Sequence, residues 1–191
     1  MNSRMRQVIR RMTLTAILLA LLIVGQLLFG LIGAPLSQYF VGSWVNLIIA
    51  LTAIIMGWPY ALAIGLLSPL VALLVGIAPP FIEFVPFIAL GNGLYAITLY
   101  LIFCIKVRDR FKVLILLLGV TIASFAKAGL LYVTIVLVIM PTLPLNAMQV
   151  TLFTATFSIN QVPTALIGGG LASLASQPLS IAITHTTGAR V

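Results

Sequence analysis

Apolar residues fill most of the chain in long runs, and short breaks of glycine, proline or charged residues separate these runs. A helix that crosses the hydrocarbon core of a bilayer needs about 20 mostly apolar residues. The pattern therefore predicts an all-α fold, an integral membrane bundle of six transmembrane helices that forms a single membrane domain over residues 1–191. The predicted spans cover about residues 12–33, 43–57, 59–77, 84–105, 113–140 and 147–175.

Two of the breaks contain a proline that ends or interrupts a helix. Gly57-Trp58-Pro59 divides the second span from the third, because proline is tolerated at a helix start but not in a helix interior. Pro163 lies within the sixth span and disturbs the turn before it. Interrupted membrane helices expose backbone groups where a cavity can use them, so this part of the sixth span is a candidate site.

Composition places these helices in a lipid bilayer. The chain is 62% hydrophobic and 6% charged, whereas soluble domains carry roughly 25% charged residues. A formal charge of +8 could suggest a nucleic-acid partner. The basic residues crowd the ends of apolar runs, however, which is the pattern of membrane orientation. We therefore expect the lipid bilayer, and no nucleic acid, as a partner.

With six crossings, every basic residue except Lys127 falls on one side of the membrane. Four arginines precede the first span, four basic residues lie in the turn 106–112, and Arg190 follows the last span. The positive-inside rule makes this side cytoplasmic, so both termini are predicted to be cytoplasmic. The opposite side carries no basic residue and one acid, Glu83.

The first apolar run, Met12 to Ala34, could also be a secretory signal peptide. It exceeds the usual core of such peptides, roughly 7–15 residues, and no clear small-x-small cleavage site follows it. We expect a retained first helix.

Three polar residues are predicted deep within the bilayer. Lys127 lies near the middle of the fifth span, where a lysine costs about 2.5 kcal/mol or more and is expected to face protein or a watery cavity. It is either part of a ligand or ion route, or a structural lysine that pairs with a carbonyl or snorkels. Asn160 and Gln161 lie at a similar depth, roughly 20 Å along their helix, and either line a cavity or bond neighbouring helices.

The fourth span adds further candidates for substrate binding. Asn92 and Tyr95 are three residues apart and share a face of this helix. Glu83 lies just before the helix, where an acid is favoured next to the N-terminus. Glu83 therefore caps the helix, contacts a ligand, or does both.

The predicted outer loop between the first two spans contributes Gln38, Tyr39 and Trp44, and Asn46 begins the second span. Tyrosine and tryptophan are enriched as anchors at membrane interfaces. They are equally suited to form an aromatic wall for the ring of a ligand.

Motifs for catalysis and metal binding are missing from the sequence. It contains no Gly-x-x-x-x-Gly-Lys phosphate loop, no Cys/His cluster with zinc spacing and no Gly-x-Ser-x-Gly elbow. We expect no cofactor and no metal site, and a small intramembrane enzyme is disfavoured.

Several segments, taken together, resemble the substrate-binding S-components of energy-coupling factor (ECF) vitamin transporters. In order along nearly the whole chain they are TLTAILLALL, which contains Ala16 and Ala20, then QYFVGSWVNLI, GLLSPLVALLVGI and PPFIEFVPFIALGN.

The resemblance implies a multi-pass subunit of a bacterial cell membrane that captures a water-soluble vitamin or precursor from outside. Such subunits pair with an ECF transmembrane coupling protein and two ABC ATPases, which hydrolyse the ATP. The resemblance implies that Ala16 and Ala20 form the partner interface and that the loop from Gln38 to Trp44 closes over the ligand. It also implies a pocket in the outer halves of helices four to six, formed by Asn92, Tyr95, Lys127, Asn160 and Gln161.

For the ligand itself, the residues suggest a pyrimidine, thiamine-like or pyridoxine-like molecule. Tyr39, Trp44 and Tyr95 can stack on a flat ring, and Glu83, Lys127 and the side-chain amides offer donors and acceptors. The alternative function is a non-transport membrane scaffold subunit of a cell-wall assembly complex, which would bind neither a vitamin nor ATPases.

Overall fold

The computed structural model describes residues 3–33, 36–79, 81–105 and 109–187, and these ranges are helical with no strand. Short 3-10 segments, η1 (Ile82–Phe84) and η3 (Met140–Thr142), and a π-helical segment, η2 (Tyr132–Ile139), join the longer helices. The α-helices are α1 (Ser3–Gly30), α2 (Leu36–Met56), α3 (Trp58–Leu74), α4 (Val85–Phe103), α5 (Asp109–Leu131), α6 (Ala147–Thr156) and α7 (Gln161–Thr187).

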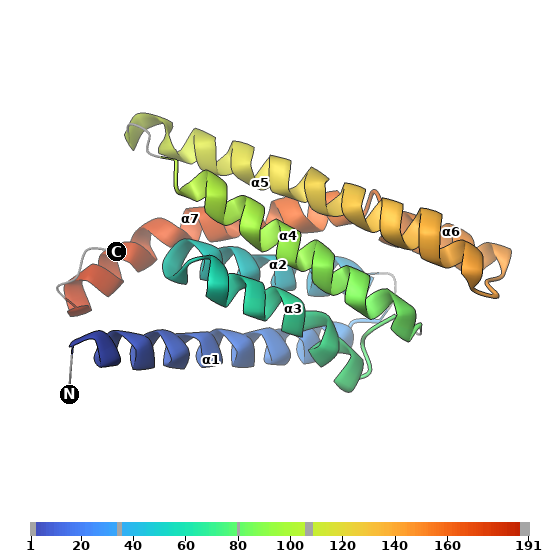
Figure 1. Cartoon of the computed structure of the whole chain (residues 1–191), viewed down its shortest axis with the longest axis horizontal. Coiled ribbons are helices and arrows are strands. Elements are labelled where there is room, and N and C mark those ends of the chain that lie inside the picture. Colours follow the sequence, from blue (N-terminus) through green and yellow to red (C-terminus); the bar gives the residue numbers. More distant parts are fainter. Residues whose placement is uncertain (1–2, 34–35, 80, 106–108, 188–191) are drawn as a thin grey trace.

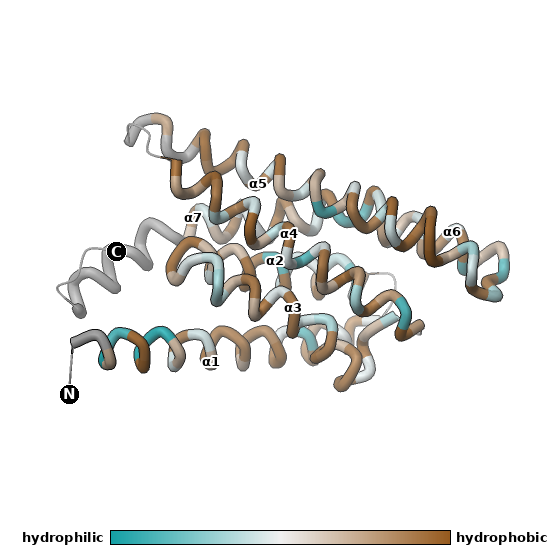
Figure 2. The backbone as a smooth tube through the Cα atoms, viewed as in Figure 1, coloured by the Kyte–Doolittle hydropathy of each residue, from teal (hydrophilic) through white to brown (hydrophobic). Residues whose placement is uncertain are grey.

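The helices run roughly along one common axis, which gives the bundle two distinct ends (Figure 1). The start of α1, the α4–α5 connection and the end of α7 lie at the left end in this view, which we call the terminal end. The end of α1, the start of α2, and the α3–α4 and α5–α6 connections lie at the right end, which we call the opposite end. Hydrophobic residues cover most of every helix, and the start of α1 is a hydrophilic stretch at the terminal end (Figure 2).

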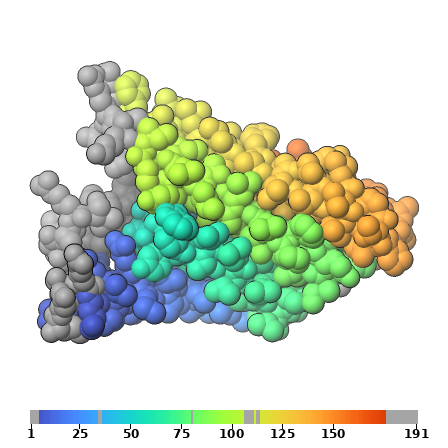
Figure 3. All heavy atoms as spheres, in the orientation of Figure 1, coloured from blue at the N-terminus to red at the C-terminus, as the bar shows by residue number. Residues whose placement is uncertain are grey.

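The outside of the bundle is apolar, as a lipid-facing surface requires. Five helical segments in the described ranges are long and apolar enough to cross a membrane, and α3 is a shorter apolar helix of 17 residues. Large apolar side chains such as Leu28, Leu101 and Leu174 are exposed on different helices. Side chains of α3 and α4 cover one face of the bundle between α1 and α5 (Figure 3).

Both proline-containing breaks predicted from the sequence are present. α2 ends at Met56 and α3 begins at Trp58, with Pro59 in its first turn and Gly57 between the helices at a φ of 95°. This left-handed backbone favours glycine because it has no Cβ. The break in the sixth span is also confirmed, since α6 ends and α7 begins shortly before Pro163.

One predicted loop is a helix instead. The segment from Gln38 to Trp44 was expected to form an outer loop, but it lies in the first turns of α2. The polar side chains of this segment have partners inside the bundle: Gln38 bonds Thr156, and Tyr39 bonds Asn160. Because α6 and α7 satisfy these groups, the helix can continue through them.

Close contact between α2 and α7 fixes the centre of the bundle. A Cβ on Gly168 of α7 would collide with the backbone oxygen of Ser43 and would lie 2.6 Å from the backbone nitrogen of Leu47. Only glycine leaves room for the α2 backbone at this position.

Candidate functional site

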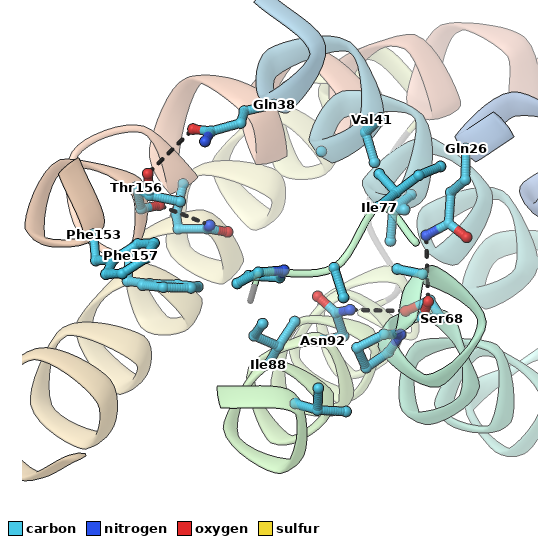
Figure 4. Close-up of a pocket in the computed structure, with 18 of the residues that line it drawn as sticks. Gln26, Gln38, Val41, Ser68, Ile77, Ile88, Asn92, Phe153, Thr156 and Phe157 are labelled. Atoms are coloured by element: carbon cyan, nitrogen blue, oxygen red, sulfur yellow. Dashed lines mark hydrogen bonds between the residues drawn. The ribbon is translucent and has the colours of Figure 1, made fainter. Parts of the chain in front are cut away.

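A cavity of about 490 Å³ lies in the half of the bundle next to the opposite end. Its walls come from the last turns of α1, α3 and α5, the first turns of α2, α4 and α7, and α6, so it gathers residues from every α-helix. Figure 4 shows a polar side with Gln26, Ser68 and Asn92, and across the cavity Gln38, Thr156 and two phenylalanines. The wall residues used below are Gln26, Gln38, Val41, Ser68, Pro69, Ala72, Asn92, Lys127, Phe153, Thr156, Phe157 and Gln161.

The polar side of the cavity is organised by a proline inside α3. Pro69 has no N–H to donate to the carbonyl of Gly65, one turn earlier. The Ser68 hydroxyl takes this role and donates to the Gly65 oxygen at 2.9 Å. Ser68 then accepts from its neighbours: Asn92 Nδ2 donates to Ser68 Oγ at 2.8 Å, and Gln26 Nε2 donates to the Ser68 carbonyl oxygen at 3.3 Å. A Ser-Pro step thus links α1, α3 and α4.

Lys127 of α5 lines the cavity and is itself almost completely buried. Its side chain is only 4% exposed. Its Nζ donates to Asn46 Oδ1 of α2 at 2.8 Å and lies 5.6 Å from the centre of the Tyr95 ring. The Tyr95 hydroxyl donates in turn to the Ala165 carbonyl oxygen at 2.9 Å. Asn46 and Tyr95 therefore hold the lysine in position on the cavity wall.

Aromatic rings close the side of the cavity opposite the amides. Phe84, Phe153 and Phe157 are buried, with ring centroids 5.2 to 6.3 Å apart. Phe153 and Phe157 line the cavity, whereas Phe84 stands behind them. The cavity thus has an apolar wall that can take the body of an organic molecule.

The break between α6 and α7 provides hydrogen bonds across the mouth of the cavity. Thr156 Oγ1 lies 3.1 Å from Gln38 Oε1 of α2 and 2.8 Å from the Leu152 carbonyl oxygen, and its single proton serves one of these acceptors at a time. Gln161 Nε2 donates to the Thr156 carbonyl oxygen at 2.9 Å and so satisfies a group at the end of α6. Beside it, Tyr39 donates to Asn160 Oδ1 at 3.0 Å, next to a smaller cavity of about 40 Å³.

Comparison with known proteins identifies the family. A family model described as "ECF transporter, substrate-specific component" matches residues 10–180, nearly the whole chain. The chain belongs to this family. Neither the curated proteins nor the solved structures contain a significant match.

Membership makes this S-component a substrate-binding subunit of a transporter, and not an enzyme. It also makes the chain a multi-pass membrane protein, in agreement with its apolar helices. The family works with ECF coupling and ATPase modules, whereas nothing supports the alternative of a cell-wall scaffold. In the described part of the chain, no group of three or more His, Cys, Asp or Glu side chains could hold a metal ion.

The structure separates the ten candidate substrate-binding residues of the S-component into groups, and their roles remain predictions. Four of them line the large cavity: Gln38, Asn92, Lys127 and Gln161.

Two candidates, Asn46 and Tyr95, lie behind Lys127 and support it. Two more, Tyr39 and Asn160, line the smaller cavity, which Gln161 also touches.

The remaining two candidates lie away from both cavities. The Trp44 indole donates from Nε1 to the Leu21 carbonyl oxygen at 3.0 Å and lies over Gly25, so it packs α2 against α1. Glu83 is exposed in η1, immediately before α4. An acid is favoured near a helix N-terminus, but the N-cap residue of α4 is Phe84, and no side-chain capping hydrogen bond is present there.

The sequence prediction missed Gln26, Ser68, Thr156, Phe153 and Phe157. Gln26 had a usable signal, because it is the only strongly polar residue between Thr15 and Ser37. The argument that singled out Lys127 applies equally to a glutamine in an apolar span. The phenylalanines carried no signal, since an apolar residue in an apolar helix does not reveal which way it faces.

We predict that Thr156→Val weakens the closure of the cavity in this S-component. Valine keeps the shape but removes the hydroxyl that contacts Gln38 and the Leu152 carbonyl oxygen. A hydrogen bond between membrane helices is worth about 0.6 kcal/mol on average. Ligand dissociation should become roughly threefold faster, measured by displacement of a labelled ligand. Thr151→Val is the control, because Thr151 also donates to the carbonyl four residues earlier but does not line the cavity. Equal rates for both variants would contradict the prediction.

Proposed function

We propose that this S-component captures a water-soluble vitamin or vitamin precursor from outside a bacterial cell and passes it to ECF coupling and ATPase subunits for import. The observation that carries the proposal is the cavity of about 490 Å³ near the opposite end of the bundle, away from the start of α1 and the end of α7. Small-molecule sites typically measure about 300–1,000 Å³ and combine apolar walls with a few polar groups. The cavity of this protein has that size and that composition.

The charge pattern supports an outward-facing cavity. Arg4, Arg6, Arg10 and Arg11 lie in the first turns of α1, and Arg110 and Lys112 lie in the first turn of α5. These segments belong to the terminal end (Figure 1), and the positive-inside rule assigns that end to the cytoplasm. With the predicted six crossings and both termini inside, the proposed opening faces outward.

The predicted preference for a pyrimidine-like or pyridoxine-like ring rested on stacking by Tyr39, Trp44 and Tyr95 and on donors and acceptors such as Lys127. None of the three aromatic residues lines the large cavity, whereas Lys127 does. Phe153 and Phe157 offer the aromatic surface instead. The geometry thus supports a small organic ligand without requiring a planar one.

The experiment that tests the capture role is a search for the ligand of the purified protein. We expect the protein to retain a small molecule that mass spectrometry identifies as a vitamin or precursor, and to bind the same molecule in calorimetry. An empty protein that binds no member of a vitamin panel would contradict the proposal.

Partner binding is predicted to occur on α1. Ala16 and Ala20 are exposed, one turn apart on the same face of α1, and such small residues let another helix approach closely. Ala16→Trp should abolish uptake by cells that express the complete transporter, because the indole keeps the coupling protein away. Ligand binding by the purified subunit should stay within twofold of the wild type.

Leu21→Trp is the matched control for this prediction. Leu21 is also exposed on α1 but points about 100° away from Ala20 and about 140° away from Ala16 around the helix. It should support uptake and co-purify with the coupling protein. Loss of uptake in both variants to the same degree would argue against a specific interface at Ala16 and Ala20.

A further inference from the structure

The charges around the cavity are unbalanced. Lys127 is the only basic residue among the described residues that line the cavity, and none of those residues is acidic. Of the side chains that the structure describes, the only acid is Glu83, which is exposed and lies outside the cavity wall. A buried cation is normally compensated by an anion. A bound anion would supply the negative charge that no described wall residue provides.

The surroundings of Lys127 leave it able to bind such an anion. An ammonium group has three N–H donors, and Asn46 Oδ1 accepts one of them at 2.8 Å. The face of the Tyr95 ring lies 5.6 Å away and stabilises positive charge without using a donor. Lysine thus has donors left on the cavity wall.

Asn46 adds a second donor beside the lysine. Because its Oδ1 accepts from Lys127, its Nδ2 must point elsewhere, and this atom is buried without a hydrogen-bond partner. Two donors in neighbouring positions match the two oxygens of a carboxylate. Asn46 lies directly behind Lys127 and does not itself line the cavity, so its amide would have to turn toward the cavity to reach the second oxygen.

The polar side of the cavity has the opposite character. The Ser68 hydroxyl donates to Gly65, so it must accept from Asn92 Nδ2, and this fixes Asn92 Oδ1 as an unused acceptor. The Ser68 carbonyl must likewise face Gln26 Nε2, which leaves Gln26 Oε1 without a partner. A buried acceptor without a hydrogen-bond donor lowers the stability of the folded protein. A hydroxyl or amide N–H on the ligand supplies that donor once the side chains adjust.

We propose, building on the capture role above, that this cavity selects a small monocarboxylic acid that carries a hydroxyl or amide donor and an apolar body. The carboxylate binds Lys127 and Asn46, and the apolar body lies against Phe157 and Val41. A single lysine matches one negative charge, so a doubly charged phosphate ester is disfavoured. A cationic ligand such as thiamine is disfavoured too, because the described wall offers it no acid.

Matched pairs of acid and neutral probes test this selectivity on the purified full-length protein. The pairs are pantothenate and panthenol, and biotin and biotin methyl ester; thiamine and pyridoxine represent cationic and neutral vitamins. We expect an acid to bind at least tenfold more tightly than its neutral counterpart in calorimetry. The molecule retained after purification should also be a monocarboxylate.

Two variants test the role of the lysine pair. Lys127→Met should weaken binding of the acid roughly 30-fold or more, as loss of one member of a buried charged contact does, and should change binding of the neutral counterpart less than threefold. Asn46→Asp keeps the lysine and the shape of the side chain but supplies an internal carboxylate, so it should also weaken acid binding at least tenfold. Ser124→Ala is the control, because Ser124 is buried one turn before Lys127 without lining the cavity.

The outcomes separate this inference from the capture role. A neutral or cationic vitamin that binds as tightly as any acid, or a retained molecule without a carboxylate, would overturn the inference and leave the capture role intact. Equal weakening of acid and neutral probes by Lys127→Met would assign the lysine a structural role and would also overturn it. If Lys127→Met does not fold, the acid and neutral probes on the wild-type protein and the Asn46→Asp variant still test the inference. Absence of any ligand would overturn both proposals.

Discussion

Gly168→Ala is expected to destabilise this S-component by about 3 kcal/mol, the upper part of the usual range for added atoms in a packed core. The new methyl group would meet the backbone oxygen of Ser43 and the backbone nitrogen of Leu47, both in α2. Backbone atoms inside a helix cannot turn aside as a side chain can, so α2 and α7 must separate. The helix propensity gained on replacing glycine with alanine, about 1 kcal/mol, offsets only part of this loss.

Gly170→Ala is the matched control, two residues further along the same helix. A Cβ at Gly170 meets nothing within 4 Å, so this variant should be as stable as the wild type or more stable. Thermal unfolding in one detergent, followed by circular dichroism or by aggregation, measures both. A Gly168→Ala protein as stable as Gly170→Ala would mean that α2 and α7 do not pack as described.

The close packing of α2 and α7 also affects the site. Asn46 lies on the side of α2 that meets α7, since a Cβ on Gly168 would lie 2.8 Å from the Asn46 Cβ. The same Asn46 accepts the hydrogen bond from Lys127. A shift of α2 therefore changes the position of the lysine, which connects the stability of the bundle to the chemistry of the cavity.

Sequence patterns predicted the helical segments and the deepest polar residues because both depend on the bilayer. A buried lysine in an apolar helix is costly wherever it faces, so Lys127 could be singled out without any tertiary contact. Gly57 with Pro59, and Pro163, act on the local backbone, so their breaks could be predicted too. Each of these features follows from one short stretch of sequence and its solvent.

The predictions that failed concern residues whose role depends on which helix packs against them. Trp44 resembles an interfacial anchor or a ligand wall, but Gly25 on α1 leaves room for its ring, and the two are far apart in the sequence. The segment from Gln38 resembles a loop because it is polar, yet Thr156 of α6 satisfies it within a helix. Neither Gly25 nor Thr156 can be identified as a contact from the local sequence pattern, because both contacts depend on which helices pack together.

Ala72→Phe should abolish ligand binding while leaving the protein folded. Ala72 lies in the last turn of α3 and lines the cavity, so a phenyl group there occupies space that the ligand needs. Filling a cavity usually maintains or raises stability. We expect affinity to fall at least about a hundredfold, close to 2.8 kcal/mol at 1.4 kcal/mol for each factor of ten, with a thermal midpoint equal to or above that of the wild type.

Leu74→Phe provides the control for the Ala72 prediction. Leu74 lies two residues later in the same helix and is 85% exposed, so its replacement adds the same ring outside the cavity. Calorimetry with the ligand identified from the wild type should give unchanged affinity for this variant. A folded Ala72→Phe protein that still binds with wild-type affinity would place the substrate elsewhere, and the cavity between Lys127 and Phe157 would not be the transport site. The combination of lost binding and kept stability distinguishes an occupied ligand site from damage to the fold, because damage lowers both.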